Sequence, residues 1–123
     1  MILGVGVDLC RISRMEASIA HPRFLQRVFS EHERQYILEK NRVGAQSAAG
    51  FFAAKEALLK ALGTGIVQTD LSVIEVRHDE AGAPYYQMNE EIERLLYAKG
   101  ASRAHLSISH DEDYAVAFCV LEG

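Results

Sequence analysis

The fold is decided by one stretch of sequence, Phe51-Phe52-Ala53-Ala54-Lys55-Glu56-Ala57-Leu58-Leu59-Lys60-Ala61-Leu62. Only Lys55, Glu56 and Lys60 interrupt an otherwise apolar run. At about 100° per residue, the side chains of Glu56 and Lys60 lie about 100° and about 140° around the helix from Lys55. A helix this apolar is normally buried nearly all round. We therefore expect a buried helix over Ala45–Leu62, whose few charges face a cleft or a shared interface.

A second interpretation of the same charges stays open. Glu56 and Lys60 are spaced i,i+4, so they also fit an ion pair on an exposed helix face, worth only a few tenths of a kcal/mol. The polar stripe is too narrow for a freely solvated helix, which favours a functional role. A carboxylate and an ammonium one turn apart can share a bound metal–phosphate group.

Asp8 is the second unusual charge, because it ends the apolar segment Ile2–Val7. The segment is expected to be a buried strand, and its Gly4 and Gly6 indicate close approach of a neighbouring backbone or a ligand. Asp8 fits either a cap for the helix expected over Arg11–Ala20 or a ligand for a hard cation. Two carboxylates, phosphate oxygens and waters make a usual Mg²⁺ site, and Asp8 and Glu56 are the best two candidates.

The remaining elements predict an α+β fold. Ser30-Glu31-His32-Glu33 is a capping box that starts a helix, and Asn89 caps another that ends at Lys99-Gly100. Strands are expected over Leu71–His78, Pro84–Met88, Ala104–Ser109 and Tyr114–Leu121. The order of elements favours a single domain over residues 1–123, with a mostly antiparallel sheet and helices packed on one face. Edge strands in so small a sheet favour oligomerisation.

Composition excludes several classes of function. The chain has 123 residues, 49% hydrophobic and 24% charged, which is typical of a globular protein. Its net charge of −4 disfavours general nucleic-acid binding. No targeting segment or membrane span is visible, and the two cysteines, Cys10 and Cys119, form no metal or redox motif. We expect a cytoplasmic protein with reduced cysteines that act as small buried hydrophobes.

The charge is unevenly distributed. Residues 1–60 hold nine basic and six acidic side chains, whereas residues 61–123 hold four and eleven. Arg11, Arg14, Arg23 and Arg27 face only one nearby acid, Glu16. Such a basic patch suits an acidic partner, either phosphate groups or an acidic protein. A plain solvated helix face is the alternative.

Two further segments carry polar groups with an ambiguous meaning. Leu62-Gly63-Thr64-Gly65 follows the long helix and fits either a simple C-cap and turn or a backbone approach to phosphate. Ser107-Ile108-Ser109-His110 places serines on one face of a strand. A Ser–His hydrolase is disfavoured, because neighbouring Ser109 and His110 point to opposite faces and no GxSxG motif exists. His110 is either structural or a ligand contact.

Together these segments resemble the holo-acyl-carrier-protein synthase family, the small trimeric 4′-phosphopantetheinyl transferases. The resemblance spans essentially the whole chain and rests on three motifs in order. These are Gly4-Val5-Gly6-Val7-Asp8-Leu9, then Phe52-Ala53-Ala54-Lys55-Glu56-Ala57 running into Lys60-Ala61-Leu62-Gly63-Thr64-Gly65, and finally Ser107-Ile108-Ser109-His110-Asp111 with the following Tyr114-Ala115-Val116-Ala117.

The resemblance implies a reaction. The 4′-phosphopantetheine arm of coenzyme A (CoA) would pass to a serine of apo acyl carrier protein, releasing 3′,5′-ADP in support of fatty acid biosynthesis. Asp8 and Glu56 would bind Mg²⁺, and Glu56, directly or through a metal-bound water, would take the serine proton. Lys60 would stabilise or protonate the leaving phosphate. The CoA cleft would also include Lys55, Gly63, Gly65, Pro84 and His110.

The resemblance also implies partners. Acyl carrier protein is strongly acidic, so Arg14, Arg23, Phe24 and Arg27 would form its docking face. The family forms homotrimers with active sites between subunits. One position departs from the family pattern, because Phe51 stands where arginine is frequent.

Two rival functions remain at this stage. An oligomeric binding module for CoA or acidic proteins would bind without forming a covalent product. A metal-dependent phosphodiesterase would use the same carboxylates with water as acceptor, and would consume CoA without any carrier protein.

Overall fold

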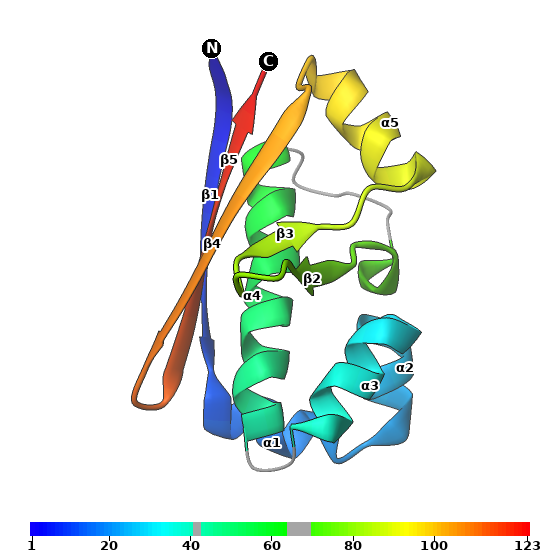
Figure 1. Ribbon diagram of the computed structural model, residues 1–123, viewed down its shortest axis with the longest axis vertical. Helices are drawn as coiled ribbons and strands as arrows, with labels where there is room; N and C mark the ends of the chain where they lie inside the picture. Colours follow the sequence, from blue (N-terminus) through cyan, green and yellow to red (C-terminus); the bar gives the residue numbers. More distant parts are fainter. Residues whose placement is uncertain (41–42, 64–69) are drawn as a thin grey trace.

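A three-stranded antiparallel sheet and one long helix dominate the computed structural model, which describes residues 1–40, 43–63 and 70–123. The sheet has the order β1-β5-β4, from β1 (Ile2–Arg11), β5 (Tyr114–Glu122) and β4 (Arg103–Asp111). Helix α4 (Gly44–Leu62) runs along one face of the sheet, and the other helices lie on that same side (Figure 1). The predicted α+β fold with helices on one face is confirmed.

The smaller elements surround α4. Three helices lie beside its N-terminal end, and a two-stranded antiparallel sheet and a last helix lie beside its other half (Figure 1). In chain order they are α1 (Ile12–Ile19), α2 (Pro22–Val28), α3 (Glu31–Glu39), the 3-10 helix η2 (Leu71–Val73), β2 (Val76–His78), β3 (Pro84–Tyr86) and α5 (Glu90–Lys99).

The predicted helix ends are confirmed. Ser30 accepts a hydrogen bond from the Glu33 amide while the Glu33 carboxylate accepts from the Ser30 amide, which is a complete capping box. Asn89 caps α5, and left-handed glycines end α4 (Gly63, φ 70°) and α5 (Gly100, φ 81°). Local sequence signals therefore determine where these helices begin and end.

Two predicted strands are partly wrong. The strand expected to be buried over Ile2–Val7 runs on to Arg11 with one face exposed, so Asp8 lies within β1. The segment expected to be extended over Leu71–His78 is a strand only from Val76, and Leu71–Val73 forms η2. Asp70 caps this turn by accepting from the Ser72 amide, and the carbonyls of Leu71 and Ile74 accept from Lys55 Nζ at 2.9 and 2.7 Å. A buried side chain thus satisfies backbone groups that a strand partner would otherwise satisfy.

Two glycines let β1 approach α4 closely. A Cβ atom on Gly4 would lie 2.1 Å from the Ala61 carbonyl oxygen, and one on Gly6 would lie 1.9 Å from that of Ala57. Both contacts are impossible for any other residue, because backbone atoms of α4 cannot yield. The close approach predicted from these glycines is confirmed, and the neighbour is α4.

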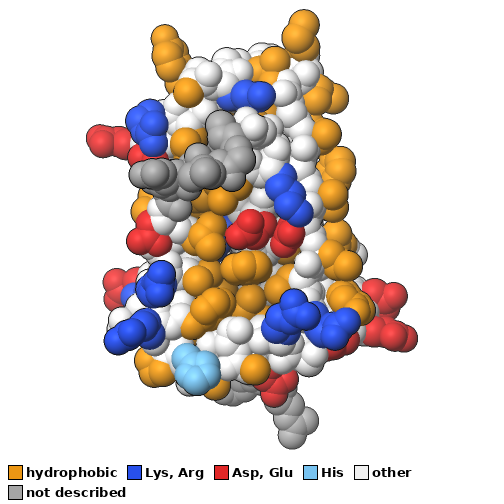
Figure 2. Space-filling model, turned by 180° about the vertical axis from the view of Figure 1, so that it is seen from behind, with side chains coloured by type: hydrophobic (Ala, Val, Ile, Leu, Met, Phe, Trp, Pro, Cys, Tyr) orange, Lys and Arg blue, Asp and Glu red, His pale blue; other side chains and the backbone are white. Residues whose placement is uncertain are grey.

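The two faces of the sheet differ in burial. The inward side chains of β5 (Ala115, Ala117, Cys119 and Leu121) are fully buried. On the outer face Val5, Leu9 and Phe118 are 55%, 62% and 47% exposed. Figure 2 shows hydrophobic side chains along the edge of the molecule that this sheet forms. Both cysteines are free and buried, as predicted.

Candidate active site

The packing of β1 on α4 brings Asp8 and Lys60 together. Lys60 Nζ donates to Asp8 Oδ1 at 2.9 Å and to the Val7 carbonyl at 3.0 Å. The Asp8 side chain is 17% exposed and that of Lys60 is 54% exposed, so the pair lies at the edge of a solvent-facing site. The alternative role of Asp8 as a cap is excluded, because Asp113 accepts from the Ser13 amide and hydroxyl at the start of α1.

Glu56 belongs to the same cluster. Partial burial raises the pKa of its carboxyl, the charge of Asp8 raises it further, and Lys60 acts in the opposite direction. Two carboxylates and one ammonium thus share the site at the β1 edge of the sheet. Near the centre of the face in Figure 2, acidic side chains are set among hydrophobic ones with a basic side chain beside them.

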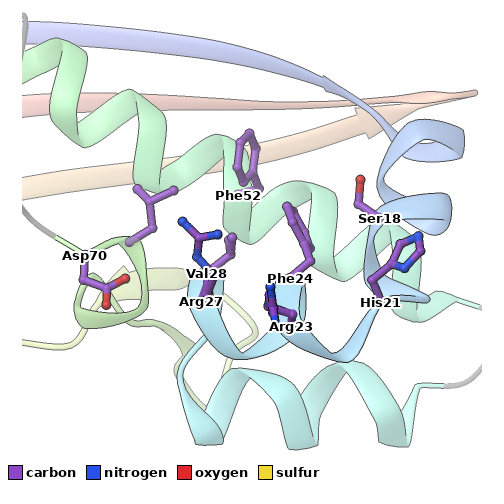
Figure 3. Close-up of a pocket in the computed structure, with 9 residues that line it drawn as sticks. Ser18, His21, Arg23, Phe24, Arg27, Val28, Phe52 and Asp70 are labelled. Carbon is purple, nitrogen blue, oxygen red and sulfur yellow. The ribbon is translucent and has the colours of Figure 1, made fainter.

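A large cavity of about 800 Å³ opens beside α2 and the middle of α4. Phe24, Val28 and Phe52 line it with apolar groups, and Arg23 and Arg27 stand at its opening opposite Asp70 (Figure 3). Three of the four predicted docking residues therefore lie together. The fourth, Arg14, is exposed on the neighbouring helix α1 and does not line the cavity.

A second cavity, of about 340 Å³, contains Pro84 and His110. The side-chain amide nitrogen of Gln46 lies 2.6 Å from His110 Nε2, and Ser47 and Ile108 complete this part of the wall. The cavity is lined from the N-terminal half of α4, from the end of α3, from the β2–β3 hairpin and from β4. None of Asp8, Glu56 and Lys60 lines it.

Phe51 forms an aromatic wall of this second cavity. Its ring packs against Tyr36 and His78 with centroids 5.4 and 5.7 Å apart, and Tyr36 and His78 are stacked at 5.1 Å. Burial lowers the pKa of His78, and the charge of nearby Lys40 lowers it further. Lys40 Nζ also lies 4.9 Å above the Tyr36 ring. Phe51, at the position where arginine is frequent in the family, is therefore part of an aromatic cluster with Tyr36 and His78.

Lys55 does not reach solvent. Its side chain has no exposed area, and its ammonium donates to Glu33 Oε1, Leu71 O and Ile74 O. These three bonds use all three N–H groups of the ammonium. Sequence reasoning missed Glu33 as its partner, because the capping box already accounts for a glutamate there. Gly63 is the left-handed cap of α4, and Gly65 lies outside the described residues.

The predicted site residues therefore fall into separate groups. Asp8, Glu56 and Lys60 meet at the β1 edge, whereas Pro84 and His110 line a cavity against β4, at the opposite edge of the same sheet. Along α4, Ser47 and Lys60 are about 20 Å apart at 1.5 Å per residue.

Within the part of the chain that the structure describes, no helix is both long and apolar enough to cross a membrane.

Comparison with known proteins identifies the class. Residues 4–119 match the model of the 4′-phosphopantetheinyl transferase superfamily. The chain belongs to this superfamily, which confirms the family resemblance inferred from its three motifs.

The relatives are more specific. The chain is 39% identical over 123 residues to a holo-[acyl-carrier-protein] synthase of Treponema denticola, with full coverage of both chains. It is 42% identical over 125 residues to the same enzyme of Clostridium tetani, covering 100% of this chain and 98% of the relative.

Solved structures agree. The fold matches the holo-[acyl-carrier-protein] synthase of Neisseria meningitidis with a TM-score of 0.89 at 32% identity, covering both chains fully. It matches that of Bacillus anthracis, solved in complex with CoA (3′,5′-ADP), with a TM-score of 0.81 at 38% identity, covering 100% and 98% of the two chains.

Proposed function

We propose that this chain transfers the 4′-phosphopantetheine group of CoA to a serine of apo acyl carrier protein and releases 3′,5′-ADP. The observation that carries the proposal is the cluster of Asp8, Glu56 and Lys60, which are held together by the close packing of β1 on α4. Relatives across the full chain are holo-[acyl-carrier-protein] synthases, and one relative structure contains CoA (3′,5′-ADP).

The reaction requires a base and a cation near the phosphorus atom that is attacked. The serine oxygen forms a bond to the β-phosphorus of the CoA pyrophosphate, the serine proton leaves, and the bond to the 3′,5′-ADP oxygen breaks. Glu56 is suited to accept the proton, directly or through a metal-bound water, because it is a partly buried carboxylate that interacts with both Asp8 and Lys60. Lys60 donates to Asp8 and Val7, and its third N–H has no acceptor among the described residues. The Lys60 side chain is half exposed, so its ammonium can also donate to a phosphate oxygen of the leaving group.

The donor set fits a magnesium ion. Asp8 and Glu56 supply hard carboxylate oxygens, and Mg²⁺ is usually bound by one or two carboxylates together with substrate phosphates and waters. Among the described residues there is no cluster of three or more His, Cys, Asp or Glu that would form a closed metal cage. Asp8 and Glu56 would hold the ion, and when bound it would neutralise charge on the pyrophosphate.

The cavity beside α2 fits the carrier protein. An acidic helix would meet Arg23 and Arg27 at the opening, while an apolar side chain would enter between Phe24 and Phe52 (Figure 3). Arg14 on α1 would extend the basic surface toward Asp8. This arrangement supports the docking role proposed for the N-terminal arginines.

We also propose that the working molecule is a homotrimer with its active sites between subunits. The exposed apolar face of the sheet, with Val5, Leu9 and Phe118, is typical of a surface that another chain covers. The groups predicted to contact CoA lie at opposite edges of one sheet. A site assembled from two copies would bring one copy's Glu56 next to the other copy's His110 and Pro84. We place this activity in the cytoplasm, in support of fatty acid biosynthesis.

Intact mass spectrometry tests the function. Apo acyl carrier protein is incubated with CoA, Mg²⁺ and the protein, with and without a chelator. The expected result is a gain of one phosphopantetheine on the carrier that the chelator abolishes. CoA that is bound but intact would indicate a binding module instead. CoA consumed without carrier protein would indicate a phosphodiesterase.

A further inference from the structure

Lys55 and Glu33 form an ion pair that is sealed from solvent, with both side chains fully buried. Lys55 Nζ lies 2.6 Å from Glu33 Oε1. Removing two charges from water is costly, and the attraction between them repays this cost only with good geometry and further hydrogen bonds. Burial raises the pKa of Glu33 and lowers that of Lys55, and each partner opposes that change in the other.

The remaining hydrogen bonds of the pair all go to backbone groups. Glu33 Oε1 accepts from the Ser30 amide at 2.9 Å, and Oε2 accepts from the Val76 amide at 2.8 Å. Lys55 donates to the carbonyls of Leu71 and Ile74. Three of these four backbone groups belong to residues 70–76. In that segment the pair binds one amide, which donates to Glu33, and two carbonyls, which accept from Lys55.

Other contacts also hold residues 70–76, because Ile74 and Val76 are fully buried and the Glu75 carbonyl accepts from the Gln87 amide at 2.8 Å. Leu71–Val73 form a single 3-10 turn, and strand pairing begins only at Val76, which pairs with Tyr86. Asn89 Nδ2 donates to the Val73 carbonyl. The Lys55 ammonium and the Glu33 carboxylate add to these contacts by fixing the backbone groups of Leu71, Ile74 and Val76.

This segment forms a wall of the cavity beside α2. Asp70 and Leu71 line the cavity across from Phe24 and Arg27, and Phe52 lies on α4 one turn before Lys55 (Figure 3). A shift of Leu71 would change the width of the cavity without touching Asp8, Glu56 or Lys60.

We propose that Lys55 is a positioning residue for carrier-protein docking, acting with Glu33 to fix the wall that residues 70–76 give to this cavity. The inference rests on the proposed function, because it assigns the cavity to the carrier protein. In this role Lys55 does not contact CoA.

The test compares Lys55→Met with a control of similar stability. Lys55→Met removes the ammonium and keeps all but the last atom's length of the side chain. The Leu71 and Ile74 carbonyls then lose this donor, and Glu33 loses its counter-charge. Leu121→Ala lowers stability by a cavity in β5, where Leu121 pairs with Gly4 and Ala104 and not with residues 70–76. The KM values for apo carrier protein and CoA, and kcat, are measured well below both melting temperatures.

The expected result is a KM for carrier protein about tenfold higher in Lys55→Met, with the KM for CoA and kcat within about twofold of wild type. Leu121→Ala should leave all three unchanged. A KM for CoA that rises while the KM for carrier stays constant would overturn the proposal, and would make Lys55 a CoA ligand. Equal effects in both variants would also overturn it, because loss of stability would then explain them.

Hydrogen exchange tests the positioning role of Lys55 separately from the proposed function, because amide exchange can be measured whether or not the protein transfers phosphopantetheine. In the wild-type protein the Val76 amide, bonded to Glu33, should be as protected as the core amides of α4. It should exchange at least about tenfold faster in Lys55→Met, or in Glu33→Gln if the first variant does not fold. Rapid exchange of Val76 in the wild type would overturn the positioning role even if phosphopantetheine transfer is observed.

Discussion

At the residue scale, α4 carries two lysines on successive turns, each paired with a carboxylate in a different environment. Lys55 is paired with Glu33 in the core, and Lys60 is paired with Asp8 at the surface. The sequence places Lys55 and Glu56 next to each other, but helical geometry turns them about 100° apart. Because of this rotation, Lys55 lies in the core as a structural group, whereas Glu56 lies at the proposed reacting centre.

Residue-level patterns indicated Asp8, Glu56 and Lys60 as candidate site residues, but they did not show that these residues meet or that Lys55 is buried. Asp8 and Glu56 are unusual because apolar residues surround both in the sequence, which is a signal that can be seen without coordinates. The partner of Lys55 is 22 residues away on another helix, and Glu33 already had a local explanation in its capping box. A contact between distant residues leaves no mark on the local pattern of either.

A pH prediction follows from His78. Its pKa is lowered by burial and by Lys40, so below about pH 6.5 the unfolded chain takes up a proton that the folded chain resists. His78 therefore contributes a loss of stability as pH falls from about 6.5 toward its lowered pKa. His78→Phe keeps an aromatic ring against Tyr36 and removes this loss.

Thermal unfolding at pH 7.5 and pH 5.5 checks this prediction. The melting temperature of His78→Phe should fall less between the two pH values than that of the wild type. The exposed His32, changed to Gln, serves as the control and should behave as wild type. An identical fall in His78→Phe and wild type would show that His78 is not the titrating group.

At the element scale, the contact between β1 and α4 builds the reacting centre. Gly4 and Gly6 face α4 two residues apart, and Asp8 follows with the same period of two along the strand. The glycines allow the close approach, and Asp8 then meets Lys60 at the end of the contact. A strand motif and a helix motif thus act as one unit.

Gly6→Ala should disrupt the packing of β1 on α4. Its Cβ would lie 1.9 Å from Ala57 O and 2.7 Å from Ala61 N, so α4 must move away from β1. We expect a loss of about 3 kcal/mol or more in the free energy of unfolding, together with loss of transfer activity. Denaturant titration and the transfer assay measure the two effects.

Gly50→Ala is the matched control for the same helix. Its Cβ would lie 3.1 Å from Ile108 Cγ2, a side-chain atom that can adjust, and alanine favours a helix by about 1 kcal/mol over glycine. The stability of this variant should stay within about 1 kcal/mol of wild type. A Gly6→Ala protein as stable as Gly50→Ala would contradict the close packing of β1 on α4.

Elements with local start and stop signals were the ones that the sequence predicted well. The capping box of α3, the asparagine cap of α5 and the left-handed glycines were all recognisable. The error over Leu71–His78 has a tertiary cause, because β-branched residues there suggested a strand while Lys55 bound the carbonyls of Leu71 and Ile74. Local propensity yields to a buried hydrogen-bond donor.

At the scale of the whole molecule, the proposed homotrimer explains why the predicted site residues do not meet within one copy. The test mixes two inactive variants, Glu56→Gln at the β1 edge and His110→Ala at the β4 edge. If each site uses one edge from each of two copies, random reassembly of equal amounts makes about a quarter of the sites fully wild type. Activity should then return to about a quarter of the wild-type level.

The mixing experiment has a clear contrary outcome. Each variant is assayed alone, and the mixture is unfolded and refolded so that chains exchange. A refolded mixture no more active than its components would mean that each copy holds its own complete site. Val5→Glu on the exposed sheet face is the companion variant, and it should yield a monomer in analytical ultracentrifugation.

The proposed transfer depends on the carboxylate of Glu56, which lies beside Asp8 and Lys60 and would both hold Mg²⁺ and accept the serine proton. The most direct test is the initial rate of phosphopantetheine transfer by Glu56→Gln, compared with wild type and with Glu93→Gln, an exposed glutamate on α5. We predict a loss of about 100-fold or more for Glu56→Gln with an unchanged fold, and a wild-type rate for Glu93→Gln. A Glu56→Gln protein that transfers at nearly the wild-type rate would contradict the account.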